Sequence, residues 1–229
     1  MKPSDTNRTR GQMRRTLFIC VWLITFAGCN ASDARNINNA GNSNVATNAP
    51  NITRSVKPQA DAEAAVIETS YGRIVIELYP NVAPQMVERF KTLIRSGFYD
   101  GQTFHRVSTE YGIVQAGDPL SRDNDPENDG SGNSDSPDLK AEFSDLPYER
   151  GTVGAARGAG DDSANSQFFI TLKRQPDFDE RYTIFGRVIE GINNADVIMG
   201  APVVEGAERP AEPIKIKQIS LQPRASFAK

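Results

Sequence analysis

The chain has 229 residues, 38% of them hydrophobic, and a formal net charge of −3. This length and apolar content allow one folded domain of ordinary size with additional segments. No cluster of Lys or Arg follows the N-terminal segment, which argues against nucleic-acid binding. Both cysteines, Cys20 and Cys29, lie near the N-terminus, and His105 is the single histidine. We therefore expect no disulfide framework and no metal site in the rest of the chain.

The first 28 residues have the organisation of an export signal. Basic residues precede an apolar run, Leu17–Ala27, whose length is typical of signal peptides and too short to span a bilayer. The run ends in Phe26–Cys29 (FAGC), which resembles the lipobox of bacterial lipoproteins, with Phe26 where leucine is usual. The resemblance implies cleavage before Cys29, its acylation, and a membrane-anchored protein facing the periplasm or the cell exterior. An ordinary signal peptide and a retained anchor helix are the alternatives.

Residues 29–61 are predicted to be the acylated cysteine and a tether. From Asn30 to about Gln59 the chain is rich in Asn, Ala, Ser and Thr and shows no hydrophobic periodicity. Such a segment buries too little apolar surface to offset its conformational entropy, so we expect it to be disordered. The folded domain is expected to span residues 62–222, followed by a C-terminal tail at 223–229.

From Ala64 onward, hydrophobic periodicity predicts short strands and two helices. The first helix is predicted over Val82–Gly97, with Pro84 in its first turn, and the second near Asn193–Met199. Many short strands with two helices favour a mainly β fold, a closed barrel with helices over its ends. The predicted strands are Val66–Thr69, Arg73–Leu78, Thr103–Val107, Gly112–Gln115, Gly151–Ala156, Gln167–Thr171, Ile184–Ile189 and Ile214–Leu221.

Four segments resemble motifs of the cyclophilin family. Their order and approximate spacing also match the family, and the resemblance extends from about Ala64 to Leu221. It implies a closed eight-stranded antiparallel β-barrel capped by two α-helices. The segments are Phe104–Val107 (FHRV), Val114–Pro119 (VQAGDP), Ser166–Ile170 (SQFFI) and Tyr182–Val188 (YTIFGRV).

The resemblance implies peptidyl-prolyl cis-trans isomerase activity, which is rotation about the Xaa-Pro peptide bond. The barrier of about 18–20 kcal/mol makes the unassisted reaction slow. Because no bond is made or broken, no cofactor is required. The reaction needs an apolar pocket for the proline ring, donors that hold the peptide backbone, and a cation near the proline nitrogen that stabilises the twisted state. The expected substrates are exported polypeptides, whose folding the enzyme would assist.

The family's motifs, carried over to this chain, imply Arg106 and Gln115 as catalytic residues. A guanidinium suits the cationic role because it is always charged and has fixed donors. The family usually has an aromatic residue where this chain has Gly112, so either Tyr111 enters the pocket as a substitute or that wall is open. The substrate-binding residues that the resemblance implies are Tyr111, Ile113, Ala156, Arg157, Gln167, Phe169, Phe178 and Tyr182.

Other conspicuous residues have structural interpretations. We expect His105 to pack below the site, and one of Phe168 and Phe169 to face the core while the other faces the groove, since side chains alternate along a strand. The acidic stretch Asp123–Gly130 hints at calcium binding. Its spacing and Pro126 break the EF-hand pattern, so a solvated loop is favoured.

Two other functions remain open from the sequence. A module of the same fold could bind proline-containing segments as a chaperone or scaffold with little turnover, and Gly112 keeps this alternative open. An unrelated β-barrel lipoprotein that binds a small ligand would have no need for the set Arg106, Gln115 and Gln167. The expected partners are proline-containing polypeptides and, through the lipid, a membrane. Nothing in the sequence demands more than a monomer.

Overall fold

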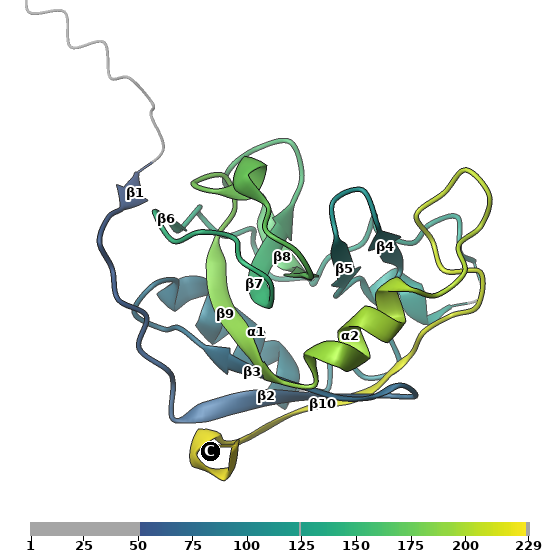
Figure 1. The fold of residues 1–229 in the computed structure, drawn as a ribbon, viewed down its shortest axis with the longest axis horizontal. Helices are drawn as coiled ribbons and strands as arrows, with labels where there is room; N and C mark the ends of the chain where they lie inside the picture. Colours follow the sequence, from purple (N-terminus) through teal and green to yellow (C-terminus); the bar gives the residue numbers. More distant parts are fainter. Residues whose placement is uncertain (1–50, 124, 228–229) are drawn as a thin grey trace, which may run out of the picture. The chain divides into compact units, whose positions relative to one another are not determined.

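The computed structural model describes residues 51–123 and 125–227. The predicted signal peptide, Cys29 and the tether up to residue 50 lie outside the described residues. No helix in the described part of the chain has the length and apolar character needed to cross a membrane. In chain order the elements are β1 (Ile52–Thr53), β2 (Glu63–Thr69), β3 (Gly72–Leu78), α1 (Pro84–Arg95), β4 (Arg106–Ser108), β5 (Ile113–Ala116), η1 (Pro119–Arg122), β6 (Phe143–Ser144), β7 (Thr152–Arg157), β8 (Ala164–Thr171), η2 (Pro176–Phe178), β9 (Ile184–Glu190), α2 (Ile192–Met199), β10 (Ile216–Pro223) and η3 (Arg224–Phe227) (Figure 1).

Eight of the strands form one antiparallel sheet in the order β10-β2-β3-β9-β7-β8-β5-β4. The tight turn between β2 and β3 uses Gly72 at φ 105°, a conformation that L side chains rarely adopt. Thr69 closes this turn, because its Oγ1 donates to the Gly72 carbonyl at 2.7 Å. β1 and β6 form a separate parallel pair. The mainly β character and the two helices are as predicted from the sequence.

The sheet does not close, which corrects the expected closed barrel. β4 and β10 lie at the two edges of the sheet and are not paired as strands. β4 is short, and the backbone N–H of Val107 donates to the carbonyl of Glu208, in the loop before β10, at 2.7 Å. That loop occupies the edge that a closing strand would need. Among the described residues, the segment before β4 also bridges the gap, where Thr103 forms an isolated bridge with Lys215. The result is an open half-barrel.

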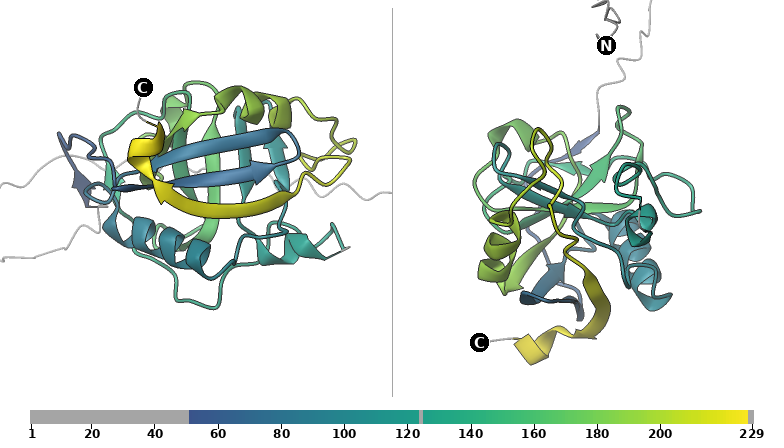
Figure 2. Two further views of the ribbon diagram at one scale, coloured as in Figure 1. Left: turned by 90° about the horizontal axis from the view of Figure 1, so that it is seen from below. Right: turned by 90° about the vertical axis from the view of Figure 1, so that its right-hand side faces the viewer.

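The interior is filled by apolar side chains from the sheet and from both helices. At the start of α1, the carboxylate of Glu142 accepts from the backbone N–H groups of Gln85 and Met86 at 3.0 Å each, which satisfies donors that a helix N-terminus leaves free. Phe90 of α1 packs on Phe168 of β8, with ring centroids 5.2 Å apart. The left view of Figure 2 shows α1 and α2 on opposite sides of β2 and β3, where they cover the two ends of the half-barrel.

The described end of the expected tether, from residue 51, contacts the folded domain. Ile52–Thr53 pairs with β6, and the backbone N–H of Ser55 donates to Asp145 Oδ2 at 2.7 Å. Val56 packs against a buried aromatic cluster. Backbone pairing needs no hydrophobic pattern, so composition alone did not reveal this arm. At the other end of the chain, Arg224–Phe227 forms a short 3₁₀-helix in the predicted tail.

Candidate active site

Strand pairing brings the implied catalytic residues into one row across β4, β5, β8 and β7. Arg106 lies opposite Gln115, Gln115 opposite Phe169, and Phe169 opposite Gly154. Successive side chains of a strand point to opposite faces. Accordingly, Phe168 belongs to the interior cluster, whereas Phe169 belongs to a second apolar cluster beside the row. The prediction that these two rings face the core and the groove is confirmed.

The polar side chains of the row form a continuous hydrogen-bond chain. Arg106 Nη1 donates to Gln115 Oε1 at 3.2 Å, and Gln115 Nε2 donates to Gln167 Oε1 at 2.9 Å. Gln167 Nε2 then donates to the carbonyl oxygens of Gly130 and Gly132, at 3.0 and 2.8 Å. Both N–H groups of the Gln167 amide are thereby used. Its side chain can offer a substrate only an acceptor oxygen, whereas Gln115 keeps one free donor.

The Arg106 end of this hydrogen-bond chain is held by a carboxylate that the sequence did not reveal. Glu208 Oε2 accepts from Arg106 Nε at 2.6 Å, and Ser108 Oγ donates to Oε1. Burial opposes ionisation of Glu208, but the hydrogen bonds from Ser108 and Arg106 prevail and hold the pKa of this carboxyl below its usual value. Glu208 lies in an irregular loop between α2 and β10, far from the recognisable motifs, so no sequence pattern singled it out.

Aromatic rings beside the row form one side of a small pocket of about 100 Å³, whose other side is polar. The rings of Phe169, Phe178 and Tyr182 contact one another pairwise, with centroids 5.1 to 5.6 Å apart. Behind Phe169, the ring of Tyr148 stacks at 5.6 Å. Gly154 makes room for this stack, because a Cβ at that position would lie 2.6 Å from Phe169 Cζ. The residues that line the pocket are Arg106, Ile113, Gln115, Ala156, Arg157, Phe169, Phe178 and Tyr182.

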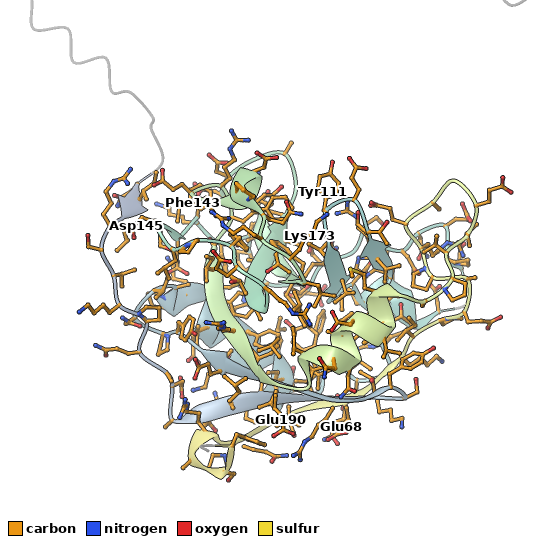
Figure 3. All side chains as sticks on the ribbon, viewed as in Figure 1. Glu68, Tyr111, Phe143, Asp145, Lys173 and Glu190 are labelled. Carbon is orange, nitrogen blue, oxygen red and sulfur yellow. The ribbon has the colours of Figure 1, made fainter. Side chains whose placement is uncertain are left out.

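Tyr111 lies beside this pocket, next to Phe178, without being one of the residues that line it. Its ring centroid lies 6.0 Å from that of Phe178, and the Arg106 guanidinium carbon lies 5.7 Å from it. Gly112 has φ 61°, which allows the tight turn that turns Tyr111 toward the pocket. Lys173 pins the turn, because its Nζ donates to the carbonyls of the two residues before Tyr111 at 3.2 and 2.6 Å. Figure 3 labels Tyr111 and Lys173 on these neighbouring loops.

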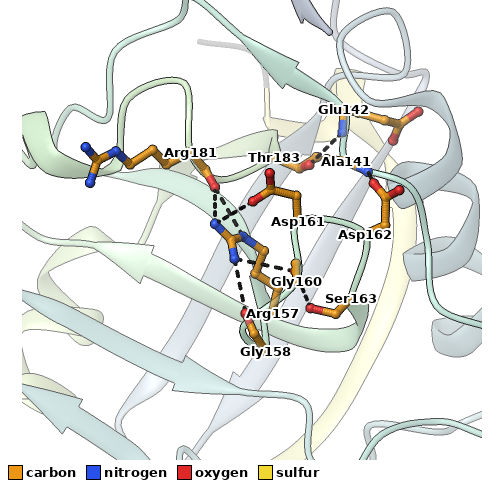
Figure 4. A network of polar contacts seen from close by, with 10 residues as sticks. All are labelled: Ala141, Glu142, Arg157, Gly158, Gly160, Asp161, Asp162, Ser163, Arg181 and Thr183. Atoms are coloured by element: carbon orange, nitrogen blue, oxygen red, sulfur yellow. Dashed lines mark hydrogen bonds and ion pairs between the residues drawn. The ribbon is translucent and has the colours of Figure 1, made fainter. Parts of the chain in front are cut away.

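The side chain of Arg157 organises a loop at the pocket's edge (Figure 4). Its Nε and Nη2 donate to the Arg181 carbonyl at 3.2 and 3.0 Å, and Nη1 donates to the carbonyls of Gly158 and Gly160. An ion pair with Asp161 at 3.1 Å adds to this network. These bonds engage every nitrogen of the guanidinium. Arg157 therefore fixes the pocket wall with its side chain, and only its backbone is left for a substrate.

His105 is buried directly before Arg106. It is 6% exposed, and neither ring nitrogen has a hydrogen-bond partner among the described residues. Burial lowers the pKa of His105 to about 4, against a smaller opposing effect of Asp118. A neutral imidazole without partners is not equipped to act on a substrate. This agrees with the structural interpretation of the residue.

The acidic loop after η1 serves the site through its backbone. The carboxylate oxygens of Asp123 accept from the Asp125 backbone N–H and from the Asn128 side-chain amide, at 2.7 and 3.1 Å. Within residues 51–123 and 125–227, no group of three or more His, Cys, Asp or Glu side chains is placed to hold a metal ion. The loop's contribution to the site is the pair of carbonyls, of Gly130 and Gly132, that accept from Gln167.

Comparison with known proteins agrees with this geometry. The family model for cyclophilin type peptidyl-prolyl cis-trans isomerases matches residues 64–221. The chain belongs to the cyclophilin family. A probable peptidyl-prolyl cis-trans isomerase of Brucella suis is 40% identical over 169 residues, which cover 71% of this chain and 85% of that protein. A Schizosaccharomyces pombe peptidyl-prolyl cis-trans isomerase is 37% identical over 155 residues, 66% of this chain and 93% of that protein.

Solved structures share the fold of this cyclophilin. The crystal structure of a Cryptosporidium parvum cyclophilin type isomerase superposes with a TM-score of 0.63 at 29% identity, covering 70% of this chain and 97% of that chain. The same protein was also crystallised in the presence of the dipeptide Ala-Pro. The family and its relatives establish the reaction of this cyclophilin, cis-trans isomerisation of peptidyl-prolyl bonds.

Proposed function

We propose that this cyclophilin isomerises Xaa-Pro bonds in exported polypeptides, from a lipid anchor at Cys29, and so assists their folding. The observation that carries the catalytic part is the position of Arg106, a permanently charged donor that lines the same small pocket as the rings of Phe169 and Phe178. The part concerning export rests on the basic segment, the apolar run and the FAGC sequence that ends at Cys29.

The proline ring of the substrate occupies the pocket between Ile113, Phe169 and Phe178. In the twisted state of the Xaa-Pro bond, amide resonance is lost and the proline nitrogen becomes able to accept a hydrogen bond. Arg106 donates to this nitrogen, which stabilises the twisted state more than either planar state and lowers the barrier of about 18–20 kcal/mol. Its side-chain hydrogen bonds with described residues are to Glu208 and Gln115 through Nε and Nη1, so Nη2 is left for the substrate.

Gln115 and the backbone of β7 hold the substrate chain. The free N–H of the Gln115 amide donates to a carbonyl of the peptide, since its Oε1 already accepts from Arg106. The pairing of β7 with β8 shifts register between Ala155 and Arg157. Ala156, which lies at this irregularity and lines the pocket, offers its backbone to an extended peptide.

Cis-trans exchange of a short Xaa-Pro peptide, followed by NMR, tests the catalytic part. The protein used is the chain from residue 30, without the signal peptide and Cys29. We expect fast exchange with the unmodified chain and with Arg187→Ala, which removes an exposed arginine of β9. We expect exchange close to the uncatalysed rate with Arg106→Ala. Full activity of Arg106→Ala would refute the role of Arg106. A folded chain without any activity would favour the non-catalytic binding module.

Labelling with radioactive palmitate in a bacterium that expresses the full chain tests the anchor. We expect incorporation into the membrane fraction, and loss of the label in Cys29→Ala. Cys20→Ala is the matched control, because Cys20 lies inside the apolar run and would be removed with the signal peptide. Label that persists in Cys29→Ala, or a protein that is exported without label, would contradict the lipoprotein proposal while leaving the isomerase activity untouched.

A further inference from the structure

Glu208 is fixed to β4 by three consecutive residues. The Val107 backbone N–H donates to the Glu208 carbonyl at 2.7 Å. On either side of Val107, Arg106 Nε and Ser108 Oγ donate to the two carboxylate oxygens. Side chains at alternate positions of a strand lie on the same face, so one carboxylate is within reach of both. The backbone hydrogen bond fixes the position of Glu208. The carboxylate is therefore already placed to accept from the guanidinium of Arg106.

The contacts of Arg106 leave one edge of its guanidinium for the substrate. Glu208 engages Nε at 2.6 Å and Gln115 engages Nη1 at 3.2 Å. Two bonds at different nitrogens fix both the direction and the plane of a guanidinium, which has five N–H donors in one plane. Without Glu208, a single bond of 3.2 Å to Gln115 would hold a long side chain with many rotamers. Arg106 would then sample orientations in which it does not point to the proline nitrogen.

The loop that carries Glu208 is also tied to the acidic loop. Arg209 pairs with Glu127 at 3.2 Å. The acidic loop supplies the carbonyls of Gly130 and Gly132, which accept from Gln167 at the far end of the hydrogen-bond chain. The loop of Glu208 therefore holds the Arg106 end of the hydrogen-bond chain, and the acidic loop holds its Gln167 end.

We propose that Glu208 is the positioning residue of this isomerase, a carboxylate that orients Arg106 toward the proline nitrogen without touching the substrate. This inference rests on the catalytic role of Arg106 given above. Orientation of a reacting group acts on the bound state, so loss of Glu208 lowers kcat and leaves KM nearly unchanged. A misplacement of about 1 Å costs on the order of 100-fold in rate.

The activity test compares Glu208→Ala, Glu208→Gln and Glu205→Ala, in the chain from residue 30. We expect Glu208→Ala to lower kcat roughly tenfold to 100-fold. Glu208→Gln keeps an oxygen that accepts from Arg106 Nε without the charge, so a smaller loss of kcat is expected. Glu205→Ala removes an exposed carboxylate from the same loop and is expected to stay within about twofold of the unmodified chain. A kcat within twofold in Glu208→Ala would overturn the proposal.

A spectroscopic measurement separates positioning from mere stability. In the unmodified chain, the Nε–H of Arg106 is expected to give a resolved ¹⁵N–¹H signal that exchanges slowly with water, because Glu208 accepts from it. Glu208→Ala should speed this exchange while the melting temperature and the signals of the core stay close to those of the unmodified chain. If Glu208→Ala does not fold, Glu208→Leu decides, because leucine has a similar size but no atom that accepts from Arg106. An unchanged kcat and exchange rate in that variant would overturn the proposal.

Arg106→Ala in the same assay distinguishes failure of this inference from failure of the catalytic role. If Arg106→Ala keeps its activity, the assigned role of Arg106 is wrong and the inference falls with it. If Arg106→Ala is inactive but Glu208→Ala is fully active, Arg106 is catalytic and orients itself without Glu208.

Discussion

Phe168 and Phe169 are neighbours on one strand with the same side chain and nearly the same burial, yet they belong to different parts of the molecule. Phe168 is 0% exposed and packs among Phe90 and Tyr99 in the interior, whereas Phe169 is 3% exposed and lines the pocket next to Gln115. Burial alone therefore does not distinguish a core residue from a site residue. The face of the strand to which a side chain points distinguishes them, because it determines which side chains that residue contacts.

The largest effect on stability is expected for Phe168→Ala. It removes a ring that is enclosed by other rings, so we expect a loss of about 3–5 kcal/mol in the free energy of unfolding. Phe169→Ala opens toward the pocket and is expected to lose less stability but to raise KM for an Xaa-Pro peptide. Urea denaturation and peptide kinetics on both variants check this. Equal effects of the two variants on KM would contradict the division between the two faces.

His105 and Arg106 repeat the contrast, because a buried residue again precedes a site residue. The pKa of His105 is lowered from 6.5 to about 4 in the folded state, so the unfolded chain binds more protons between these values. Stability is therefore complete above about pH 6.5 and falls as the pH drops toward 4, by roughly 3 kcal/mol. His105→Phe removes this contribution, so its urea midpoint should depend less on pH in this window. An unchanged pH dependence would contradict the burial of a neutral imidazole.

Gly154 lies opposite Phe169 on the neighbouring strand β7. Its substitution is expected to have a smaller effect on stability than Phe168→Ala. A Cβ at this position would lie 2.4 Å from Tyr148 Oη and 2.6 Å from Phe169 Cζ. Gly154→Ala should therefore push Phe169 into the pocket, with a loss of about 1–3 kcal/mol in the free energy of unfolding and a raised KM. Gly160→Ala is the control, since a Cβ there meets nothing within 4 Å. If both variants behave alike, the stack behind the pocket is not tightly packed.

The smallest effect is expected for the N-terminal arm. The ion pair of Arg54 with Glu180 is exposed, at 62% and 37% of the side-chain surface, so Arg54→Ala should lower stability by less than about 1 kcal/mol. A chain that begins at Ala62 also loses Val56, which packs against the aromatic cluster, and should melt at a lower temperature than Arg54→Ala. Equal melting temperatures would mean that the arm adds nothing beyond this ion pair.

The sequence was sufficient to predict those features of the fold and the site that follow from a repeating pattern or a recognisable motif. Alternation along β8 predicted the opposite directions of Phe168 and Phe169, and the four motifs predicted residues that strand pairing brings together around one pocket. Glu208 was missed because it lies in an irregular loop whose position is set by a single backbone bond to Val107. The open edge of the sheet was missed for the same reason. The strand predicted at Thr103–Val107 is instead a three-residue strand, Arg106–Ser108, that this loop covers.

Polar contacts between distant segments were equally out of reach. Gln167 was expected to bond the substrate, but its two amide hydrogens are taken by the carbonyls of Gly130 and Gly132. Nothing in the composition of the acidic loop indicates this, because any residue has a backbone carbonyl. The sequence left two possibilities for Tyr111, and its position beside Phe178 depends on the turn at Gly112 and on Lys173, which no sequence pattern reveals.

The most direct test of the account is a titration of the ¹⁵N-labelled chain with an Xaa-Pro peptide, in which amide shifts and peptide exchange are recorded together. We predict shifts around Arg106, Gln115 and Ala156, with exchange signals between the cis and trans peptide. Another cavity, of about 430 Å³, lies along α1 and is lined by Glu88, Arg89 and Thr92 among others, none of which belongs to the row. Shifts confined to that cavity, or binding at the predicted pocket without exchange, would contradict the central claim that this row of residues is the catalytic site.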